Sequence, residues 1–295
     1  MIQWTTSGES HGRALTAIIE GLPSNLPVDV EEINRYLALR QGGYGRGARQ
    51  KIETDRVQIL SGVRNKLTLG SPVCLMVENK DYANWEAYMS PYGADVSARR
   101  LTRVRPGHAD LSGVLKYDQT DARNILERAS ARETAVRVAA GTLARMFLRE
   151  LGIEVGGYVR SVAGISDDRE YTFGQLANVK ESELFMPDAA LCERAKAEID
   201  AIKEDKDTAG GIVEIRVKGL KSGFGSCMSY GEKLDGHLAG AVMGIQAIKG
   251  VEIGLGFEAA RRRGSAVHDE IFNENGKFVR KTNNAGGIEG GMSNG

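Results

Sequence analysis

Glu127-Arg128-Ala129-Ser130-Ala131-Arg132-Glu133, continued by TAVRVAAGTLARMFLREL to residue 151, is the stretch that decides the fold of this chain. Ser130 with Glu133 three residues later forms a capping box. Because Gly152 is a natural helix stop, we predict a helix over 131–151. Alanine, valine and leucine occupy most of its sides, so we expect it to be buried rather than amphipathic.

The hydrophobic patterns around this helix predict shorter strands and further helices. The expected strands cover 14–22, 70–78 and 212–218, and the last of them alternates as if one face were wet. The expected helices begin after Asp29, where Glu32 completes a capping box, and run over 188–204 and about 234–248. The segment 41–49 must be a loop, because its glycines sustain neither periodicity.

One short pattern occurs twice. Leu151-Gly152-Ile153-Glu154-Val155-Gly156 and Lys249-Gly250-Val251-Glu252-Ile253-Gly254 each follow a predicted helix, as the two copies of a duplicated unit would. No proline- or serine-rich linker separates the two halves. We therefore expect residues 1–295 to form one domain with internal pseudo-symmetry.

The composition excludes several classes of protein. Hydrophobic residues at 41% and charged residues at 26% are typical of globular proteins. The 39 basic and 39 acidic residues balance, so the whole chain has no net attraction to nucleic acid or anionic membrane. No signal peptide and no apolar run of about 18 residues is present. The three cysteines fit neither a disulfide framework nor a zinc spacing, so we expect a cytoplasmic protein without a metal site.

The start of the long predicted helix suits an anion. The first turn of a helix carries unpaired N–H groups and a partial positive charge, to which Arg128, Ser130 and Arg132 add donors. An ordinary helix cap, with its arginines paired to acids such as Asp121 and Glu127, explains the same residues equally well. The sequence alone leaves both interpretations open.

Two further basic clusters lie in predicted loops. One consists of Arg40, Arg46, Arg49 and Lys51, and the other of Arg99, Arg100, Arg103 and Arg105. Each could be a solvated surface, a weak RNA-binding segment or a site for a small anion. Neutral overall charge and the lack of interleaved aromatic residues, apart from Tyr44, favour the small anion over RNA.

Two of the four histidines lie in glycine-lined loops, where a side chain can meet a ligand. His11 lies in Gly8-Glu9-Ser10-His11-Gly12, and His108 follows Pro106-Gly107. An imidazole with its ordinary pKa of about 6.5 suits proton transfer near neutral pH. His237 lies in a predicted helix and His268 follows a run of arginines, so both are expected to be structural.

The segment GESHG also matches the G-x-S-x-G nucleophile elbow of hydrolases. That elbow requires a strand before the serine and a helix after it. Here the residues after Gly12 are strand-like and only seven residues precede Gly8. The hydrolase interpretation is therefore poor.

Five motifs together resemble those of the chorismate synthase family, in the same order and over the whole chain. They are GESHG with ALTAIIEGLP (8–23), RQGGYGRG (40–47), RPGHAD (105–110), ERASARETAVRVAAG (127–141) and NNAGGIEGGMSNG (283–295). The resemblance implies an α+β fold, a three-layer β/α/β sandwich with helices between two mainly antiparallel sheets. It also implies a homotetramer.

The resemblance implies a lyase that converts 5-enolpyruvylshikimate 3-phosphate to chorismate, the last step of the shikimate pathway. Such enzymes eliminate phosphate and a ring hydrogen in a 1,4-anti sense and require reduced FMN, although the reaction has no net redox change. NADPH is a possible electron source. Since no G-x-G-x-x-G follows a strand here, we expect a separate flavin reductase. The competing class is a non-catalytic anion- or RNA-binding module with Arg/Gly loops.

The resemblance also assigns roles to individual residues. His11 resembles the acid that protonates the departing phosphate, and His108 the group that sets the protonation of the reduced flavin. The flavin-contacting positions are matched by Arg128, Ala129, Ser130, Gln246, Ala247 and Gly290. The positions that bind substrate or NADP are matched by Arg40, Arg46 and Arg49.

Family members continue beyond the motif at which this sequence stops. They carry another flavin-binding segment, an arginine, and an aspartate assigned to deprotonation. The sequence ends at Asn294-Gly295, so we expect a chain that lacks its C-terminal part and whose own activity is open.

Overall fold

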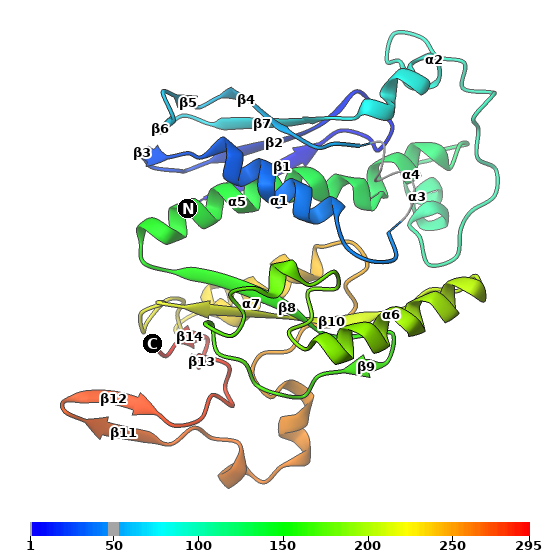
Figure 1. Ribbon diagram of the computed structural model, residues 1–295. Helices are drawn as coiled ribbons and strands as arrows, with labels where there is room; N and C mark the ends of the chain where they lie inside the picture. The colour runs from blue at the N-terminus through cyan, green and yellow to red at the C-terminus, as the bar shows by residue number, and fades with distance from the viewer. Residues whose placement is uncertain (1, 47–52) are drawn as a thin grey trace. The chain divides into compact units, whose positions relative to one another are not determined.

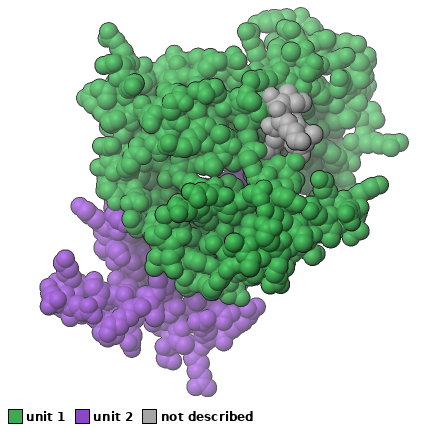
Figure 2. Space-filling view, viewed as in Figure 1, with its two compact units in different colours: residues 1–218 green, residues 219–295 purple. Residues whose placement is uncertain are grey.

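The computed structural model describes residues 2–46 and 53–295, which divide into two compact units. Unit 1 is Met1–Lys218 and unit 2 is Gly219–Gly295, coloured green and purple in Figure 2. The single domain expected over 1–295 stays a prediction. Arg49 and Lys51 lie outside the described residues.

The long predicted helix is present in unit 1. A 3-10 turn, η3 (Ala131–Glu133), leads into α5 (Thr134–Glu150). The Ser130 side chain accepts a hydrogen bond from the backbone N–H of Arg132, which caps the turn. The side chains of α5 that face the core are fully buried, including Ala135, Val136, Ala139, Leu143 and Met146. The helix is buried along its core-facing side, but Gly141, Arg149 and Glu150 are exposed, so the prediction of a helix that is buried rather than amphipathic is only partly right.

One face of α5 packs against a four-stranded antiparallel sheet. Its strands, in spatial order, are β1 (Gln3–Ser7), β2 (Ala14–Glu20), β7 (Val73–Glu78) and β4 (Val57–Ser61). Helix α1 (Val30–Gln41) lies beside α5 on the same face of the sheet, and its N-cap Asp29 accepts from the N–H of Glu31. Alternate strand residues such as Leu15, Val73 and Leu75 are completely buried in the shared core. Both predicted strands and this helix are confirmed.

The other side of α5 carries a second antiparallel sheet, so that helices lie between two sheets in unit 1 (Figure 1). This sheet has the order β10 (Gly211–Lys218), β8 (Glu154–Val162), β9 (Ile165–Ser166). Helix α6 (Ala189–Glu204), capped by Asp188, packs beside this sheet against residues of β8 and β9. The α+β class and the layered arrangement are confirmed.

Strand β10 corrects one detail of the prediction. Its alternation is present, but its apolar side chains Val213, Ile215 and Val217 are the exposed ones. Glu214 and Arg216 are partly buried because they pair with each other, at 2.6 Å. The periodicity of the sequence does not predict this ion pair, which allows the polar residues rather than the apolar ones to be partly buried.

Shorter elements complete unit 1. A small sheet contains β3 (Ser24–Pro27), β6 (Leu67–Leu69) and β5 (Val63–Arg64). The helical segments are η2 (Lys80–Asn84), α2 (Glu86–Met89), α3 (Asp110–Lys116), α4 (Arg123–Ala129) and η4 (Val179–Glu181). Helices α3 and α4 matter most, because each begins or ends beside a candidate catalytic residue.

Unit 2 has little regular structure around one helix. Its elements are η5 (Tyr230–Glu232), α7 (Leu234–Met243), η6 (Gly256–Arg261), η7 (Gly264–Ala266) and the strand pairs β11 (Ile271–Glu274) with β12 (Lys277–Arg280) and β13 (Ile288–Glu289) with β14 (Met292–Ser293). The helix is shorter than the predicted 234–248. Residues 251–254 form no strand, so the second copy of the repeated pattern folds differently from the first, where β8 follows α5. Across the ranges that the structure describes, no helix combines the length and apolar character needed to cross a bilayer.

Close packing between α3 and α4 predicts opposite effects for two helical glycines. A Cβ on Gly113 of α3 would lie 2.4 Å from Cγ2 of Ile125 in α4, and the branched side chain of Ile125 has little freedom to move. We expect Gly113→Ala to lower the free energy of unfolding by about 1–3 kcal/mol. Gly141→Ala is the matched control, because its Cβ would meet open space on α5 and should raise stability by about 0.5–1 kcal/mol. Urea titration measures both, and equal effects would contradict this packing.

Candidate functional site

His11 lies in the tight loop of the β1–β2 hairpin. Gly8 begins the loop with φ of 101°, and a Cβ there would lie 2.3 Å from the carbonyl oxygen of Ala14, so only glycine fits. Strands precede and follow this loop, whereas a nucleophile elbow needs a helix after the serine. Ser10 is moreover buried. The hydrolase interpretation is thereby excluded.

The backbone of the His11 loop is clamped by one buried amide, that of Asn79. Its Nδ2 donates to the carbonyl oxygens of Glu9 and Gly12, at 3.0 and 2.7 Å, on either side of His11. Its Oδ1 accepts from Nε of Arg132 at 2.9 Å, which fixes the direction of the amide. A segment that follows β7 therefore sets the position of a loop that precedes β2.

The imidazole of His11 is held by the carboxylate of Glu127 on α4. Nδ1 lies 2.9 Å from both carboxylate oxygens, and the backbone N–H of His11 donates to Oε2 at 2.7 Å. Burial raises the pKa of Glu127, but hydrogen bonds from His11 and Arg123 outweigh burial and hold that pKa below its usual value. The anionic carboxylate fixes the Nδ1–H tautomer and leaves Nε2 as the nitrogen that can meet a ligand.

His108 has a parallel arrangement at the start of α3. Its Nδ1 is hydrogen-bonded to Oδ1 of Asp110, a fully buried carboxylate. Arg105 holds Asp110 from the other side, donating from Nε to Oδ2 at 2.9 Å and from its backbone N–H to the same oxygen at 3.1 Å. Each candidate catalytic histidine thus has a carboxylate partner that also binds an arginine.

The pairing of Asp110 predicts a specific pH dependence. Hydrogen bonds from Arg105 lower the pKa of Asp110 to about 2, against the effect of burial. Because an unfolded aspartate has a pKa of about 3.9, this carboxylate contributes stability above pH 4 and loses that contribution as the pH falls towards 2. We expect Asp110→Asn to reduce the free energy of unfolding by about 2 kcal/mol at pH 7, and by much less near pH 2.5. Urea titrations of the parent and of Asp110→Asn at the two pH values test this. A difference in the free energy of unfolding that is as large at pH 2.5 as at pH 7 would contradict it.

Arg128 is close to the His11 loop. Its guanidinium donates to the carbonyl oxygen of Thr6 at 2.9 Å and to that of Gly8 at 3.4 Å, and it remains solvent-exposed. Arg128 and Ala129 end α4, and Ser130 caps η3. These three candidate flavin-contacting residues therefore lie immediately after Glu127, in the same turn of chain that holds His11.

Arg40 reaches the same turn from the end of α1. Its Nε donates to Oγ1 of Thr134 at 3.0 Å, and a second guanidinium nitrogen donates to the carbonyl oxygen of Ala131 at 3.1 Å. A third nitrogen lies 3.6 Å from the buried carboxylate of Asp55. Asp55 in turn binds Arg132 through two hydrogen bonds of 2.6 and 2.8 Å. Arg132 of this motif therefore pairs with Asp55, and Arg128 with backbone carbonyls, rather than with the acids expected from the sequence.

Arg46 lies in the loop after α1. Contacts other than those of Arg40 hold this part of the loop. The neighbouring Tyr44 donates from its hydroxyl to Asp200 of α6 at 2.5 Å, and its N–H donates to the carbonyl oxygen of Glu183. The structure thus ties Arg40 to the turn around Ser130, but it does not tie Arg46 there. Arg49 lies outside the described residues, so its expected role stays a prediction.

Three candidate flavin-contacting residues lie in unit 2. Gln246 and Ala247 follow α7 in a turn, where Ala247 has φ of 67°, unusual for a residue with a side chain. Gly290 has φ of 60° between β13 and β14, and a Cβ there would meet no atom within 4 Å. Both turns leave backbone groups accessible to a ligand.

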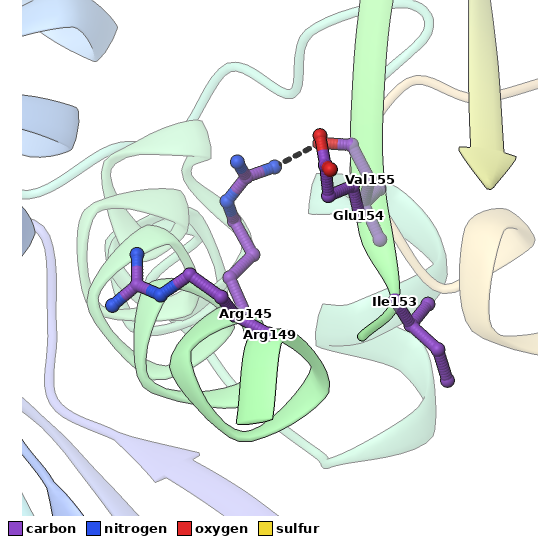
Figure 3. A pocket seen from close by; sticks show the side chains of 5 residues that line it. All are labelled: Arg145, Arg149, Ile153, Glu154 and Val155. Atoms are coloured by element: carbon purple, nitrogen blue, oxygen red, sulfur yellow. Dashed lines mark hydrogen bonds between the residues drawn. The ribbon is translucent and has the colours of Figure 1, made fainter. Parts of the chain in front are cut away.

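Two hollows in unit 1 lie apart from these residues. Figure 3 shows a recess of about 40 Å³ at the C-terminal end of α5, where Arg145 donates a hydrogen bond to the carbonyl oxygen of Val155. It lies about 22 Å along the helix from Thr134 at 1.5 Å per residue. A more open hollow of about 390 Å³ lies between the last turns of α1 and residues 180–185. Neither is lined by a residue to which the sequence assigned a catalytic or ligand-binding role, so side-chain geometry rather than cavity shape defines the site.

The turn from Glu127 to Thr134 is the centre of the site in unit 1. It contacts the loop of His11, the end of α1 at Arg40, and the buried pair of Asp55 and Asn79. His108 lies just before the neighbouring helix α3, which packs on α4. We name the residues 8–12, 40, 105–110 and 127–134 the anion site.

Two residues of this region were missed by sequence reasoning. Asn79 directly follows a predicted buried strand, and a polar residue at such a strand end is a usable signal. Trp85 lies against the ring of His11, with ring centroids 4.0 Å apart. Nothing in the pattern around Trp85 distinguishes it from an ordinary surface aromatic residue.

Comparisons with known proteins agree on one family. The family model described as chorismate synthase matches residues 2–295. Chorismate synthase from Geobacter sulfurreducens is 56% identical over 308 aligned positions, which cover 100% of this chain and 78% of that protein. Chorismate synthase from Alkaliphilus metalliredigens is 53% identical over 297 positions, which cover 100% of this chain and 78% of that protein.

The similarity extends to the fold. A crystal structure of chorismate synthase matches with a TM-score of 0.82 and 44% sequence identity. The match covers 100% of this chain and 81% of the chain in the crystal.

Proposed function

This chain belongs to the chorismate synthase family of lyases, and on that premise we propose that it eliminates phosphate from 5-enolpyruvylshikimate 3-phosphate to form chorismate. The proposal includes reduced FMN as cofactor and the last step of the shikimate pathway as the setting. The observation that carries it is the anion site, where an imidazole fixed by a carboxylate lies among arginines and a capped helical turn. The RNA-binding alternative gains no support from a buried, ion-paired cluster.

His11 is the proposed acid for the departing phosphate. A phosphate that leaves as a C–O bond breaks gains negative charge, and a proton delivered to its oxygen lowers the barrier. Glu127 holds Nδ1, so the proton is donated from Nε2. Because Glu127 stays anionic next to Arg123, it stabilises the charged imidazolium before transfer and keeps its orientation afterwards.

His108 is the proposed group that sets the protonation of the cofactor. Asp110 holds its Nδ1 as Glu127 holds that of His11, so Nε2 is again the nitrogen that can exchange a proton. The Arg105 guanidinium keeps Asp110 charged, which prevents the carboxylate from taking the proton itself. Each of the two histidines is therefore proposed to serve a different proton.

Arg40, Arg46, Arg49 and Arg128 are the proposed anion-binding residues. Substrate brings a phosphate and two carboxylates, so several guanidiniums are needed in one water-poor site, where charge interactions are strong. Arg128 uses backbone carbonyls as partners in the absence of ligand, and such neutral contacts are readily exchanged for a phosphate. Arg40 is more firmly held, so it orients the helical turn at Ser130 as well as binding charge.

The residues proposed to hold FMN fit a phosphorylated heterocycle. Arg128, Ala129 and Ser130 offer a guanidinium, a backbone turn and a hydroxyl beside a helix start, which suit a phosphate. Gln246, Ala247 and Gly290 offer an amide and two left-handed turns with accessible backbone groups. Reduced FMN, when bound, supplies electron density to the substrate as the C–O bond breaks.

The assembly and the electron supply belong to the same proposal. We expect a homotetramer that receives reduced flavin from a separate reductase, with NADPH as the possible electron source. No nucleic acid or membrane partner is required by this chemistry.

A spectroscopic experiment tests the proposed function. Under anaerobic conditions, FMN and substrate added together are expected to give an altered flavin absorbance spectrum in the presence of the protein. Neither addition alone should give the same change, because the site is completed by both phosphorylated molecules. Unchanged absorbance with both ligands, together with RNA binding, would favour the non-catalytic module.

A further inference from the structure

Trp85 stacks on the ring of His11. The two ring centroids are 4.0 Å apart and the planes are inclined by 30°, so the indole covers one face of the imidazole. Glu127 holds the ring edge at Nδ1 from a different direction. Face and edge contacts together restrict the rotation of the imidazole about both of its side-chain torsions.

Trp85 is itself firmly placed. Its indole N–H donates to Asp81 at 3.1 Å, and its backbone N–H donates to the carbonyl oxygen of Tyr82 at 2.7 Å. Tyr88 packs edge-on against it at a centroid distance of 6.4 Å. The tryptophan therefore acts as a fixed surface and not as a mobile cover.

One short segment fixes both parts of His11. Asn79 begins the segment and binds the backbone on either side of His11, while Trp85 ends it and packs on the ring. Helix η2 (Lys80–Asn84) connects the two residues and sets their spacing. A segment that served only to connect β7 with α2 would not need both contacts.

Several charged groups surround the stacked pair. The guanidinium carbons of Arg99 and Arg123 lie 4.3 and 4.9 Å from the centroid of the Trp85 ring. The acids on neighbouring elements are Glu9 in the hairpin loop, Asp81 on η2 and Glu127 on α4. Arg128 reaches the hairpin loop, and Arg105, His108 and Asp110 lie on the adjoining α3 segment. Indole is the side chain best suited to cationic neighbours, so it tolerates both arginines and a protonated imidazole.

We propose that Trp85 is a positioning residue for His11, which stacks on the imidazole and holds Nε2 in the direction from which it donates its proton. The proposal rests on the proposed function for the role of His11 as an acid. The stack itself does not depend on that role. Its two consequences, one optical and one kinetic, can be measured separately.

The optical consequence is tested in a single-tryptophan protein. Trp4 and Trp85 are the two tryptophans of the sequence, so Trp4→Phe leaves Trp85 as the only indole. A protonated imidazole in contact with indole quenches its fluorescence. We expect the imidazole of His11 to quench the emission of Trp85 in ligand-free protein at pH 5, because the two rings are in contact.

Histidine variants made in the Trp4→Phe protein show which imidazole quenches the fluorescence of Trp85. His11→Asn, and independently His11→Gln, should raise the emission at pH 5, whereas His108→Asn should leave it unchanged. Emission that is the same in the parent and in both His11 variants would overturn the stack. These outcomes do not depend on catalysis, so they separate this proposal from the proposed function.

The kinetic consequence is tested with two substitutions of Trp85. Trp85→Leu removes the aromatic face and should lower kcat by roughly ten- to a hundredfold with little change in KM, because a misplaced acid affects the chemical step. Trp85→Phe keeps a stacking ring and should restore most of kcat. Equal losses for both variants, or a loss confined to KM, would overturn the positioning role. If the parental protein shows no turnover while its fluorescence behaves as expected, the proposed function fails and the stack stands.

Discussion

Replacing His11 with alanine is expected to lower turnover by about 10²–10⁴-fold, the range typical for loss of a general acid. The imidazole is the group that Glu127 and Trp85 hold, and alanine cannot donate a proton from that position. Flavin binding should be retained, because the candidate flavin-contacting residues of unit 1 are held by contacts of their own. Anaerobic turnover with reduced FMN and a separate flavin titration measure the two quantities.

His237→Ala is the matched control for that experiment. His237 is exposed on α7, and the sequence predicts a structural role for it. Its replacement should leave turnover near that of the parent. Near-normal turnover in His11→Ala would remove His11 from the mechanism, whatever the control shows.

Replacing Arg132 with leucine is expected to destabilise the protein by about 3 kcal/mol, at the lower end of the range for a broken buried ion pair. Arg132 and Asp55 are both more than nine-tenths buried, so the substitution leaves a carboxylate in a place that water does not reach. Arg40, at 3.6 Å from Asp55, offsets part of the loss. Urea unfolding measures the change in stability.

Arg56→Leu tests whether burial is the cause. Arg56 forms the same type of pair with Glu31, but both side chains are about two-thirds exposed or more. Exposed pairs contribute roughly 0.2–1 kcal/mol, so this variant should unfold almost like the parent. Arg132→Leu should also disturb the His11 loop, because Arg132 fixes the amide of Asn79, which binds that loop. Arg56→Leu should leave the loop unchanged. Equal destabilisation by the two substitutions would contradict this account.

The fold could be predicted where local chemistry determines it. Ser130 and Asp29 cap the helices that their hydroxyl and carboxylate predict, and Gly152 ends α5 with φ of 74°. Branched residues gave the positions of β2 and β7, because burial of alternate side chains requires that pattern. These features depend on neighbours in the sequence, so periodicity and capping rules suffice.

The features that sequence reasoning missed depend on distant partners. Asn79 and Trp85 approach His11 only after β1, β2 and β7 have paired, and no local pattern encodes that meeting. The apolar exposure of β10 and the absence of a strand at 251–254 likewise follow from tertiary context. The glycine-lined loops of His11 and His108 could be recognised from the sequence, but their carboxylate partners became clear only in space.

The central claim is that one site protonates and expels a phosphate from a substrate that reduced flavin activates. The measurement that tests it most directly is phosphate release by the protein from 5-enolpyruvylshikimate 3-phosphate under nitrogen, with FMN reduced by light. The account predicts that phosphate and chorismate appear in equal amounts, and that release stops when the flavin is oxidised. Release of phosphate without chorismate, or release that is independent of reduced flavin, would contradict it.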